Sequence, residues 1–294
     1  MKNFFIFLIK GEFDPNKIQI KEVTGTLHRS KNSEDFIERE WQKAITAGLK
    51  IWPGDTKPSR YRYVNSRVNG PVLEIEADPC VCYRDYIGSR PVKLLKQFGR
   101  DFSANSVTVN TLLLAKTESG QEQIMLTIRR ASHDSKAGGY HASLGGCIAL
   151  GETPKEAILR EVEEESGLSP AEIRKLVCQN IIYEPWENTY AVNFYSETDV
   201  AVEKIKERKH DSENEIIFID ADVFLRDKLF LPTVHALVTA GLANILTLGR
   251  KRYDQEWFDE VADNLARKSI VYNLSLVRRW LENRDAKRLK NFYS

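Results

Sequence analysis

The sequence predicts an α/β protein: a sandwich built on a mixed sheet, with an N-terminal α+β extension and a helical C-terminal segment. Stretches typical of strands occur in the N-terminal part of the chain and again in its middle. One amphipathic helix separates the strands of the middle series, and this order suits strands and helices packed in layers. We expect three regions, residues 1–100, 101–230 and 231–294.

Composition describes an ordinary globular protein. The chain has 294 residues, of which 42% are hydrophobic and 29% charged. Its formal net charge of +1 gives no reason to expect nucleic acid or an anionic membrane as a partner, and it leaves the oligomeric state open. The four cysteines are too few and too scattered for a disulfide framework and form no C-x-x-C pair, so we expect reduced thiols in a cytoplasm.

The first region combines strand and helix patterns. The apolar run Phe4–Ile9 is shorter than the core of a secretion signal and is better explained as a buried strand. Lys17–Val23 alternates like a half-exposed strand, and Asp35–Leu49 has helical spacing. Two further strands, Tyr61–Val68 and Val72–Ala77, are separated by an Asn-Gly pair that favours a hairpin.

The middle region supplies more strands and the last region supplies helices. No run in the chain has the length of a transmembrane helix. We expect strands over residues 106–115, 123–129, 140–144, 180–183, 190–195 and 216–219. We expect helices over residues 233–248, 254–268 and 270–291.

The most informative stretch is Gly146–Leu168, GCIALGETPKEAILREVEEESGL, which we call the box. Thr153, Pro154 and Glu156 predict a helix start, with a capping threonine, a proline in the first turn and a glutamate that completes a capping box. Gly167 is a helix stop in a position that favours a left-handed residue. The box therefore predicts a loop followed by a short, well-delimited helix.

This helix places three carboxylates on one face. At about 100° per residue, Glu161, Glu164 and Glu165 fall within one arc of roughly 100°. Arg160 precedes Glu164 by one helical turn and can brace its carboxylate. Three like charges on one face make sense if a hard divalent cation lies over it, because Mg²⁺ prefers carboxylate oxygen. The alternative is a solvated acidic helix face, which is the usual meaning of a run of glutamates.

The defined positions read G-x5-E-x7-R-E-U-x-E-E-x-G-U, where U is a bulky apolar residue, and every one of them is filled. This pattern resembles the Nudix box, and the chain is identified by it as a member of the Nudix hydrolase superfamily. The resemblance implies an α/β/α sandwich over residues 101–230 that hydrolyses a nucleoside diphosphate linked to another group, using Mg²⁺ or Mn²⁺. One departure is Leu144, which stands where a proline commonly precedes the glycine pair.

The resemblance also implies residue roles. Glu161, Glu164 and Glu165 would be metal ligands, and Gly146, or Gly145 beside it, would offer a backbone carbonyl to the metal. Arg160 would orient a ligand, and Glu152 would support the geometry of the loop. The general base would be a ligand glutamate or one from a later loop, with Glu213 and Glu215 as the candidates.

A narrower resemblance involves the segment Tyr83–Ser89, YRDYIGS. With the preceding strands and the tryptophan-bearing helix, it is similar to a segment of the UDP-glucose pyrophosphatase branch, which acts on nucleotide sugars. Ser89 and Arg90 depart from that branch's pattern, and so does the uninterrupted box. The similarity implies hydrolysis of a UDP-sugar to UMP and sugar 1-phosphate, with residues 1–100 reading the base or the sugar.

Five residues are candidates for substrate binding, each with a structural alternative. Tyr83 and Arg84 either line the cleft or belong to an ordinary exposed turn. Arg129 and Arg130 contact phosphates or form a solvated strand end. Trp186 stacks on a base or anchors its own loop.

The substrate could also be ADP-ribose, a dinucleotide, a coenzyme or a damaged nucleotide. A Nudix-fold binding protein without turnover would be expected to have lost a ligand glutamate, and none is lost here.

Overall fold

The computed structural model describes residues 6–48, 51, 54–89, 98–99, 102–129, 140–141, 144–184, 188–208, 214–226, 239–253 and 256–257. Its strands are β1 Ile6–Phe13, β2 Ile18–Glu22, β3 Arg60–Asn69, β4 Val72–Val81, β5 Ser106–Lys116, β6 Glu122–Arg129, β7 Tyr140–His141, β8 Leu144–Cys147, β9 Ile173–Glu184, β10 Thr189–Thr198 and β11 Asn214–Asp220. Its α-helices are α1 Lys31–Thr46, α2 Tyr83–Gly88, α4 Pro154–Ser166, α5 Val202–Lys206, α6 Ala221–Arg226 and α7 Thr239–Arg252, and its 3-10 turns are η1 Pro15–Lys17 and η2 Pro170–Glu172.

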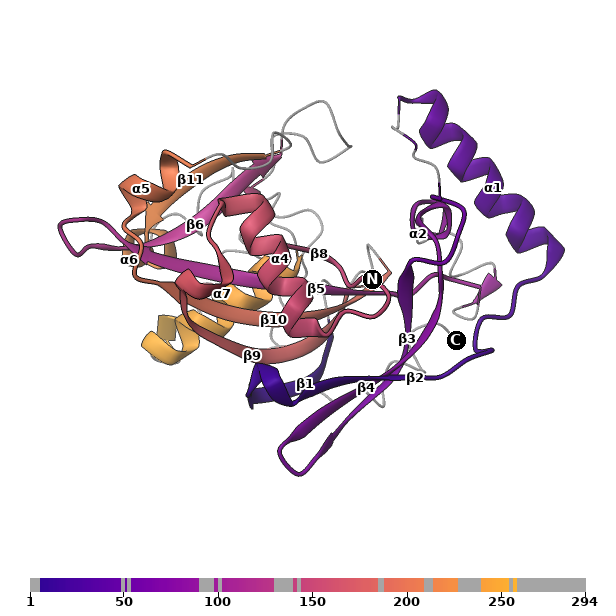
Figure 1. The fold of residues 1–294 in the computed structure, drawn as a ribbon, viewed down its shortest axis with the longest axis horizontal. Coiled ribbons are helices and arrows are strands. Elements are labelled where there is room, and N and C mark those ends of the chain that lie inside the picture. The colour runs from indigo at the N-terminus through magenta and orange to yellow at the C-terminus, as the bar shows by residue number, and fades with distance from the viewer. Residues whose placement is uncertain are drawn as a thin grey trace.

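The described strands form one mixed sheet (Figure 1). Its main path runs β1-β9-β10-β5-β3-β4-β2, and β5 also pairs with β6 and β8, while β6 pairs with β11 and β7. Strands β10 and β5 are parallel, as are β2 and β4, and the other pairs are antiparallel. The predicted mixed sheet is confirmed.

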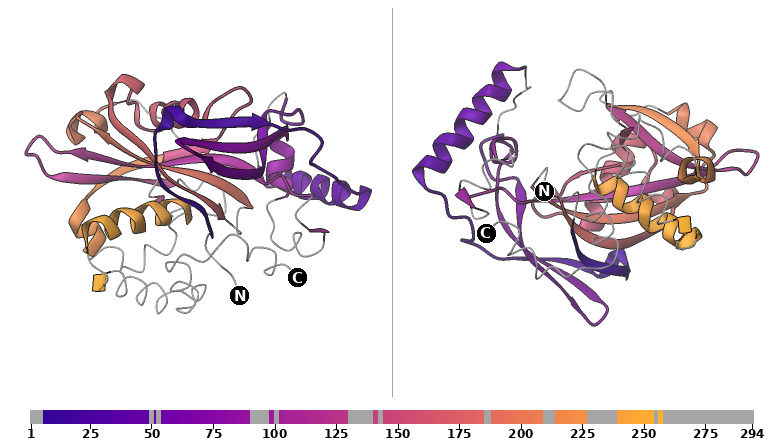
Figure 2. Two further views of the ribbon diagram at one scale, coloured as in Figure 1. Left: turned by 90° about the horizontal axis from the view of Figure 1, so that it is seen from below. Right: turned by 180° about the vertical axis from the view of Figure 1, so that it is seen from behind.

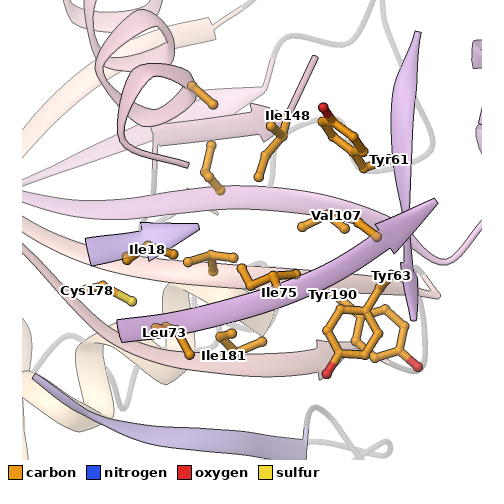
Figure 3. Close-up of a cluster of buried hydrophobic side chains, with 14 of the residues drawn as sticks. Ile18, Tyr61, Tyr63, Leu73, Ile75, Val107, Ile148, Cys178, Ile181 and Tyr190 are labelled. Carbon is orange, nitrogen blue, oxygen red and sulfur yellow. The ribbon is translucent and has the colours of Figure 1, made fainter. Parts of the chain in front are cut away.

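The two ends of this path are joined by a very short link. Strands β1 and β2 follow each other in the chain, separated by Asp14 and the single turn η1, yet they lie at opposite ends of the path. A link this short forces the path to curl until its ends approach each other. Accordingly, Ile18 of β2 and Ile181 of β9 belong to one buried cluster, and Figure 3 shows them on facing strands.

That cluster is the main core, and the N-terminal strands share it with the middle of the chain. Leu73 and Ile75 of β4 are fully buried in it, together with Val107 of β5. Tyr63 of β3 stacks on Tyr190 of β10, with ring centroids 3.8 Å apart (Figure 3). Residues of β3 and β4 therefore complete the hydrophobic core of the middle region rather than building a separate one.

Helices cover both faces of the sheet. Helix α4 packs its buried residues Ala157 and Ile158 into the main core and Val162 into a second cluster with Leu113 of β5. Helix α7 contacts β5, β10 and β9, and Figures 1 and 2 show it on the face opposite α4. The predicted α/β/α sandwich is confirmed.

Several boundaries differ from expectation. Helix α1 begins at Lys31, four residues before the predicted start, because Ser30 caps it and accepts a hydrogen bond from Ser33 N at 3.3 Å. Residues 83–88 form the short helix α2 instead of a turn. Helix α7 ends at Arg252, beyond the predicted 248, and the helices expected over residues 254–268 and 270–291 lie outside the described residues, apart from Glu256 and Trp257. Among the described helices, none combines the length and the apolarity that a membrane crossing requires.

Candidate metal and catalytic site

Helix α4 is fixed at both ends as the sequence predicts. Thr153 accepts a hydrogen bond from Glu156 N, and the Glu156 carboxylate accepts one from Thr153 N at 2.8 Å, so the capping box is complete. At the other end Gly167 has φ 70°, the left-handed conformation that glycine adopts without strain. These two ends fix which residues of the helix face the strand β8.

Arg160 joins the carboxylates of the box into one network. Its Nε donates to Glu152 Oε1 at 2.7 Å, and its Nη2 donates to Glu152 Oε2 at 3.1 Å. Its Nη1 donates to Glu161 Oε1 at 2.7 Å and to Glu164 Oε2 at 3.3 Å, and its Nη2 also reaches the carbonyl of Cys147. A planar guanidinium can hold several acceptors in fixed directions in this way, and a lysine cannot.

The glutamates of the box differ in the direction of their pKa shifts and in their exposure to solvent. Hydrogen bonds from Arg160 lower the pKa of Glu152, which also accepts from Ala149 N at 2.9 Å. Burial raises the pKa of Glu161, whose side chain is only 13% exposed, and Arg160 opposes that rise. The side chain of Glu164 is 54% exposed. Glu152 therefore secures the loop, whereas Glu161 is a desolvated carboxylate whose charged form gains from a nearby cation.

Two glycines of β8 allow close contacts that a side chain would prevent, one with α4 and one with β5. A Cβ atom on Gly146 would lie 2.3 Å from Glu161 Oε1, so the missing side chain leaves room for that carboxylate. A Cβ on Gly145 would lie 2.1 Å from the carbonyl oxygen of Val109. Gly145 N also donates to Glu165 Oε2 at 2.9 Å. Glu161 and Glu165 thus reach the same two-residue segment from one helix.

This donor set fits a hard divalent cation. Carboxylate oxygens from α4 gather along the Gly145–Gly146 backbone, and Mg²⁺ and Mn²⁺ prefer oxygen ligands. Within the described residues, no three His, Cys, Asp or Glu side chains lie together in an arrangement that could hold a metal ion. In this structure the carboxylates of Glu161 and Glu164 accept hydrogen bonds from Arg160, and that of Glu165 accepts one from Gly145 N. That Glu161, Glu164 and Glu165 hold the ion stays a prediction.

The loop from Cys147 to Glu152, which we call the box loop, is fastened to strand β3. Arg60 and Ala149 form an antiparallel β-bridge, and Leu150 N donates to Ser59 O at 3.1 Å. Gly151 N donates to the hydroxyl of Tyr61 at 2.9 Å, and that hydroxyl donates to Glu22 Oε1 at 2.8 Å. The N-terminal region therefore holds the loop that leads into α4.

Comparison with known proteins agrees with this geometry. Residues 106–237 match the family model of the NUDIX domain. The chain contains a NUDIX domain. A curated relative, the NAD-capped RNA hydrolase NudC of Klebsiella pneumoniae (strain 342), is 32% identical over 87 residues, which is 28% of this chain and 34% of the relative. The chain thus matches about a third of the length of that curated relative.

Solved structures of Nudix proteins are also similar. A mutT/nudix family protein from Listeria innocua is 22% identical, with a TM-score of 0.32, and the match covers 40% of this chain and 80% of that protein. A Nudix hydrolase from M. Smegmatis is 20% identical, with a TM-score of 0.33 and coverage of 49% and 86%. The C. elegans Ap4A hydrolase is 12% identical, with a TM-score of 0.34 and coverage of 49% and 94%.

The predicted substrate residues Tyr83 and Arg84 precede the NUDIX domain, on α2. Tyr83 contacts Trp41 edge to face and stacks near Tyr86. The guanidinium of Arg84 is engaged by carboxylates, with Nη2 at 3.1 Å from both Glu34 and Asp85. In this structure Arg84 thus ties α2 to α1, and its contact with substrate stays a prediction.

The other candidates lie on strands β6 and β11 or outside the described residues. Arg129 ends strand β6, but its side chain lies outside the described part of the molecule. Arg130, Trp186 and Glu213 also lie outside the described residues. Glu215 is on β11, is exposed, and pairs in register with Ile128 of β6.

Sequence reasoning missed the residues of β3 that hold the box loop. Tyr61 and Gly151 are 90 positions apart, so no local pattern links them. The one signal in the sequence was Gly151 itself, because a glycine just before a helix cap indicates a turn that another part of the chain has to hold. In the structure Gly151 has φ 86°, as such a turn requires.

Proposed function

We propose that this protein is a divalent-metal-dependent pyrophosphohydrolase that cleaves the diphosphate of a nucleoside diphosphate linked to another group. The observation that carries this proposal is the network around Arg160, which joins Glu152, Glu161 and Glu164, together with the approach of Glu161 and Glu165 to the Gly145–Gly146 segment within the residues that match the NUDIX model. A solvated acidic face would not need a glutamate such as Glu161, whose side chain is largely buried against the glycine pair of β8.

The roles of the residues follow from their environments. A bound Mg²⁺ or Mn²⁺ would neutralise the diphosphate and lower the pKa of a coordinated water. Glu161, Glu164 and Glu165 would hold the ion, with the carbonyl of Gly146 or Gly145 as a further donor. Arg160 orients Glu161 and Glu164, and Glu152 locks the box loop through Ala149 N. The general base is a ligand glutamate, Glu213 or Glu215.

The preferred substrate under this proposal is a UDP-sugar, hydrolysed to UMP and sugar 1-phosphate. The segment Tyr83–Ser89 supports it, because α2 lies at the end of β4 and Tyr86 and Tyr83 flank Arg60, which neighbours the box loop. A dinucleotide is the second candidate, favoured by the curated relative that is named an NAD-capped RNA hydrolase. Residues 1–100 would recognise the base or the sugar, and the C-terminal segment would pack on the core, as α7 does.

The proposed location is a cytoplasm. It is supported by the state of the four cysteines, Cys80, Cys82, Cys147 and Cys178, which are all free thiols in the structure.

A coupled phosphatase assay tests the proposal. UDP-sugars, ADP-ribose and dinucleotides resist phosphatase until their diphosphate is cleaved, whereas the monophosphate products release phosphate. We expect release from at least one member of the panel with Mg²⁺ or Mn²⁺ and none with chelator. Tight binding of a panel member without any turnover would instead support a NUDIX domain that binds and does not hydrolyse.

A further inference from the structure

Arg60 differs from the neighbouring arginines in the partners of its charged group. Its guanidinium lies over the rings of Tyr83 and Tyr86, with its central carbon 4.8 Å and 5.8 Å from the two ring centroids. Its Nη1 is buried and has no hydrogen-bond partner. Within the part of the chain that the structure describes, no acidic side chain pairs with it.

Neighbouring arginines differ from Arg60 in this respect. Arg29 lies 3.0 Å from an oxygen of Asp85, Arg84 lies 3.1 Å from Glu34, and Arg160 is shared by three glutamates of the box. Each of these charges is balanced within the protein. A half-buried guanidinium held only by aromatic rings keeps most of its capacity to bind an anion, since ring faces accept none of its donors as strongly as a phosphate oxygen does.

The position of Arg60 connects it to the box. Its backbone forms the β-bridge with Ala149, whose own N–H donates to Glu152 of the Arg160 network. The side chain of Arg60 lies on the side of β3 that faces α2, while that of Tyr61 points to the core and the box loop. An anion at Arg60 would therefore lie beside the loop that leads to the glutamates and remain within reach of solvent, because Arg60 is only half-buried.

We propose that Arg60, supported by the rings of Tyr83 and Tyr86, is a binding site for a phosphate group of the substrate. This inference rests on the proposed function and adds a residue that the box does not contain. The rings of Tyr83 and Tyr86 limit the positions that the guanidinium can take, and the bridge to Ala149 keeps the backbone of Arg60 beside the box loop. Arg84, whose donors are engaged by carboxylates, is not that site.

The test uses methylenediphosphonate, a diphosphate analogue with a bridge that water cannot cleave. Its affinity is measured by calorimetry in Mg²⁺ buffer for wild type, Arg60→Met and Arg60→Lys. Methionine keeps a long unbranched chain against the tyrosines and removes the charge, and lysine keeps the charge. Arg67→Met is the matched control, because Arg67 lies on the same strand and pairs with Glu74 and Glu76 far along the hairpin.

We expect Arg60→Met to weaken binding at least about tenfold, Arg60→Lys to weaken it less, and Arg67→Met to leave it unchanged. On the substrate found in the panel, Arg60→Met should raise KM by a similar factor with kcat within about threefold of wild type. Equal affinities for wild type and Arg60→Met would overturn the inference, and so would equal losses in the lysine and methionine variants accompanied by a lower Tm. If the affinity follows this order but no substrate is hydrolysed, the phosphate site stands and the proposed hydrolase activity does not.

Discussion

At the scale of single residues, the carboxylates of the acidic face of α4 should lower the stability of the metal-free protein while being needed for its activity. Glu161 and Glu165 both approach the Gly145–Gly146 segment, and Arg160 offsets only part of their charge. Without a metal, like charges held this close are unfavourable for folding, and with one they become its ligand field. Substitutions that remove one charge should therefore affect activity and stability in opposite directions.

Glu165→Gln tests this opposition. Glutamine keeps the shape and an oxygen that can accept from Gly145 N, and it removes one charge. We expect the metal-free variant to be as stable as wild type or slightly more so, and its kcat to fall at least about 10²-fold. Added Mg²⁺ should raise the Tm of wild type more than that of the variant. Near wild-type turnover with an unchanged response to Mg²⁺ would mean that the acidic face is only solvated surface.

The two glycines of β8 should respond differently to alanine. At Gly146 the added methyl meets the carboxylate end of Glu161, a flexible group that can move, so activity should fall at least about tenfold while Tm changes little. At Gly145 the methyl meets the carbonyl of Val109, which belongs to the sheet, so unfolding should become easier by about 1–3 kcal/mol. Thermal unfolding and kcat of the two variants are compared directly. The same loss of stability in both would contradict this distinction.

At the scale of elements, strand β3 acts on the box loop through one hydroxyl. Tyr61→Phe keeps the buried ring and removes the oxygen that accepts from Gly151 N and donates to Glu22. We expect kcat to fall about 3- to 30-fold with KM nearly unchanged, because the loop loses a fixed position rather than a substrate contact. Tyr63→Phe is the control, since the Tyr63 hydroxyl bonds to Ser66 within β3. Equal kinetics in the two variants would remove Tyr61 from this role.

The C-terminal end of α4 has a pH-dependent support. Arg208 donates to the carbonyl of Gly167 at 2.8 Å and to both oxygens of Glu172. Its bonds to Glu172, with those from Ser169, lower the pKa of Glu172 from 4.5 to about 2. A depressed folded-state pKa contributes stability above the unfolded value and loses it as the pH falls from about 4.5 towards 2. We expect Glu172→Gln to lower Tm at pH 7, and the gap to close across that window. A gap that stays constant down to pH 2 would exclude this ion pair as its cause.

Elements with local signals could be predicted, and elements defined by distant partners could not. The capping box of α4 and the Asn-Gly hairpin of β3 and β4 are encoded within a few residues, and the structure contains both. The start of α1 was misplaced because the Ser30 cap lies before the apolar stripe. The roles of Arg60 and Tyr61 depend on contacts with the box loop, about 90 positions away, and no local sequence pattern predicts such contacts.

At the scale of the whole molecule, the first region shares its main hydrophobic core with the middle region. Tyr63, Leu73 and Ile75 are buried against residues of β9 and β10. A chain that begins at Phe102 would expose that surface to water and should not unfold cooperatively, because it loses buried apolar side chains worth about 1.5–3 kcal/mol each. Circular dichroism melting of this fragment and of the full chain checks the expectation. A fragment with a sharp transition near the full-length Tm would show that the first region is dispensable for folding.

Strand β1 also sets an order of events during synthesis. It leaves the ribosome long before β9, yet Ile6 pairs with Tyr183 and Phe13 pairs with Cys178 of β9. Until β9 has been made, the hydrogen-bonding edge of an apolar strand has no native partner, and such edges promote association between chains. Because β2 follows β1 after a single turn, the hairpin of β3 and β4 can bind β2 early and hold β1 in place until β9 arrives.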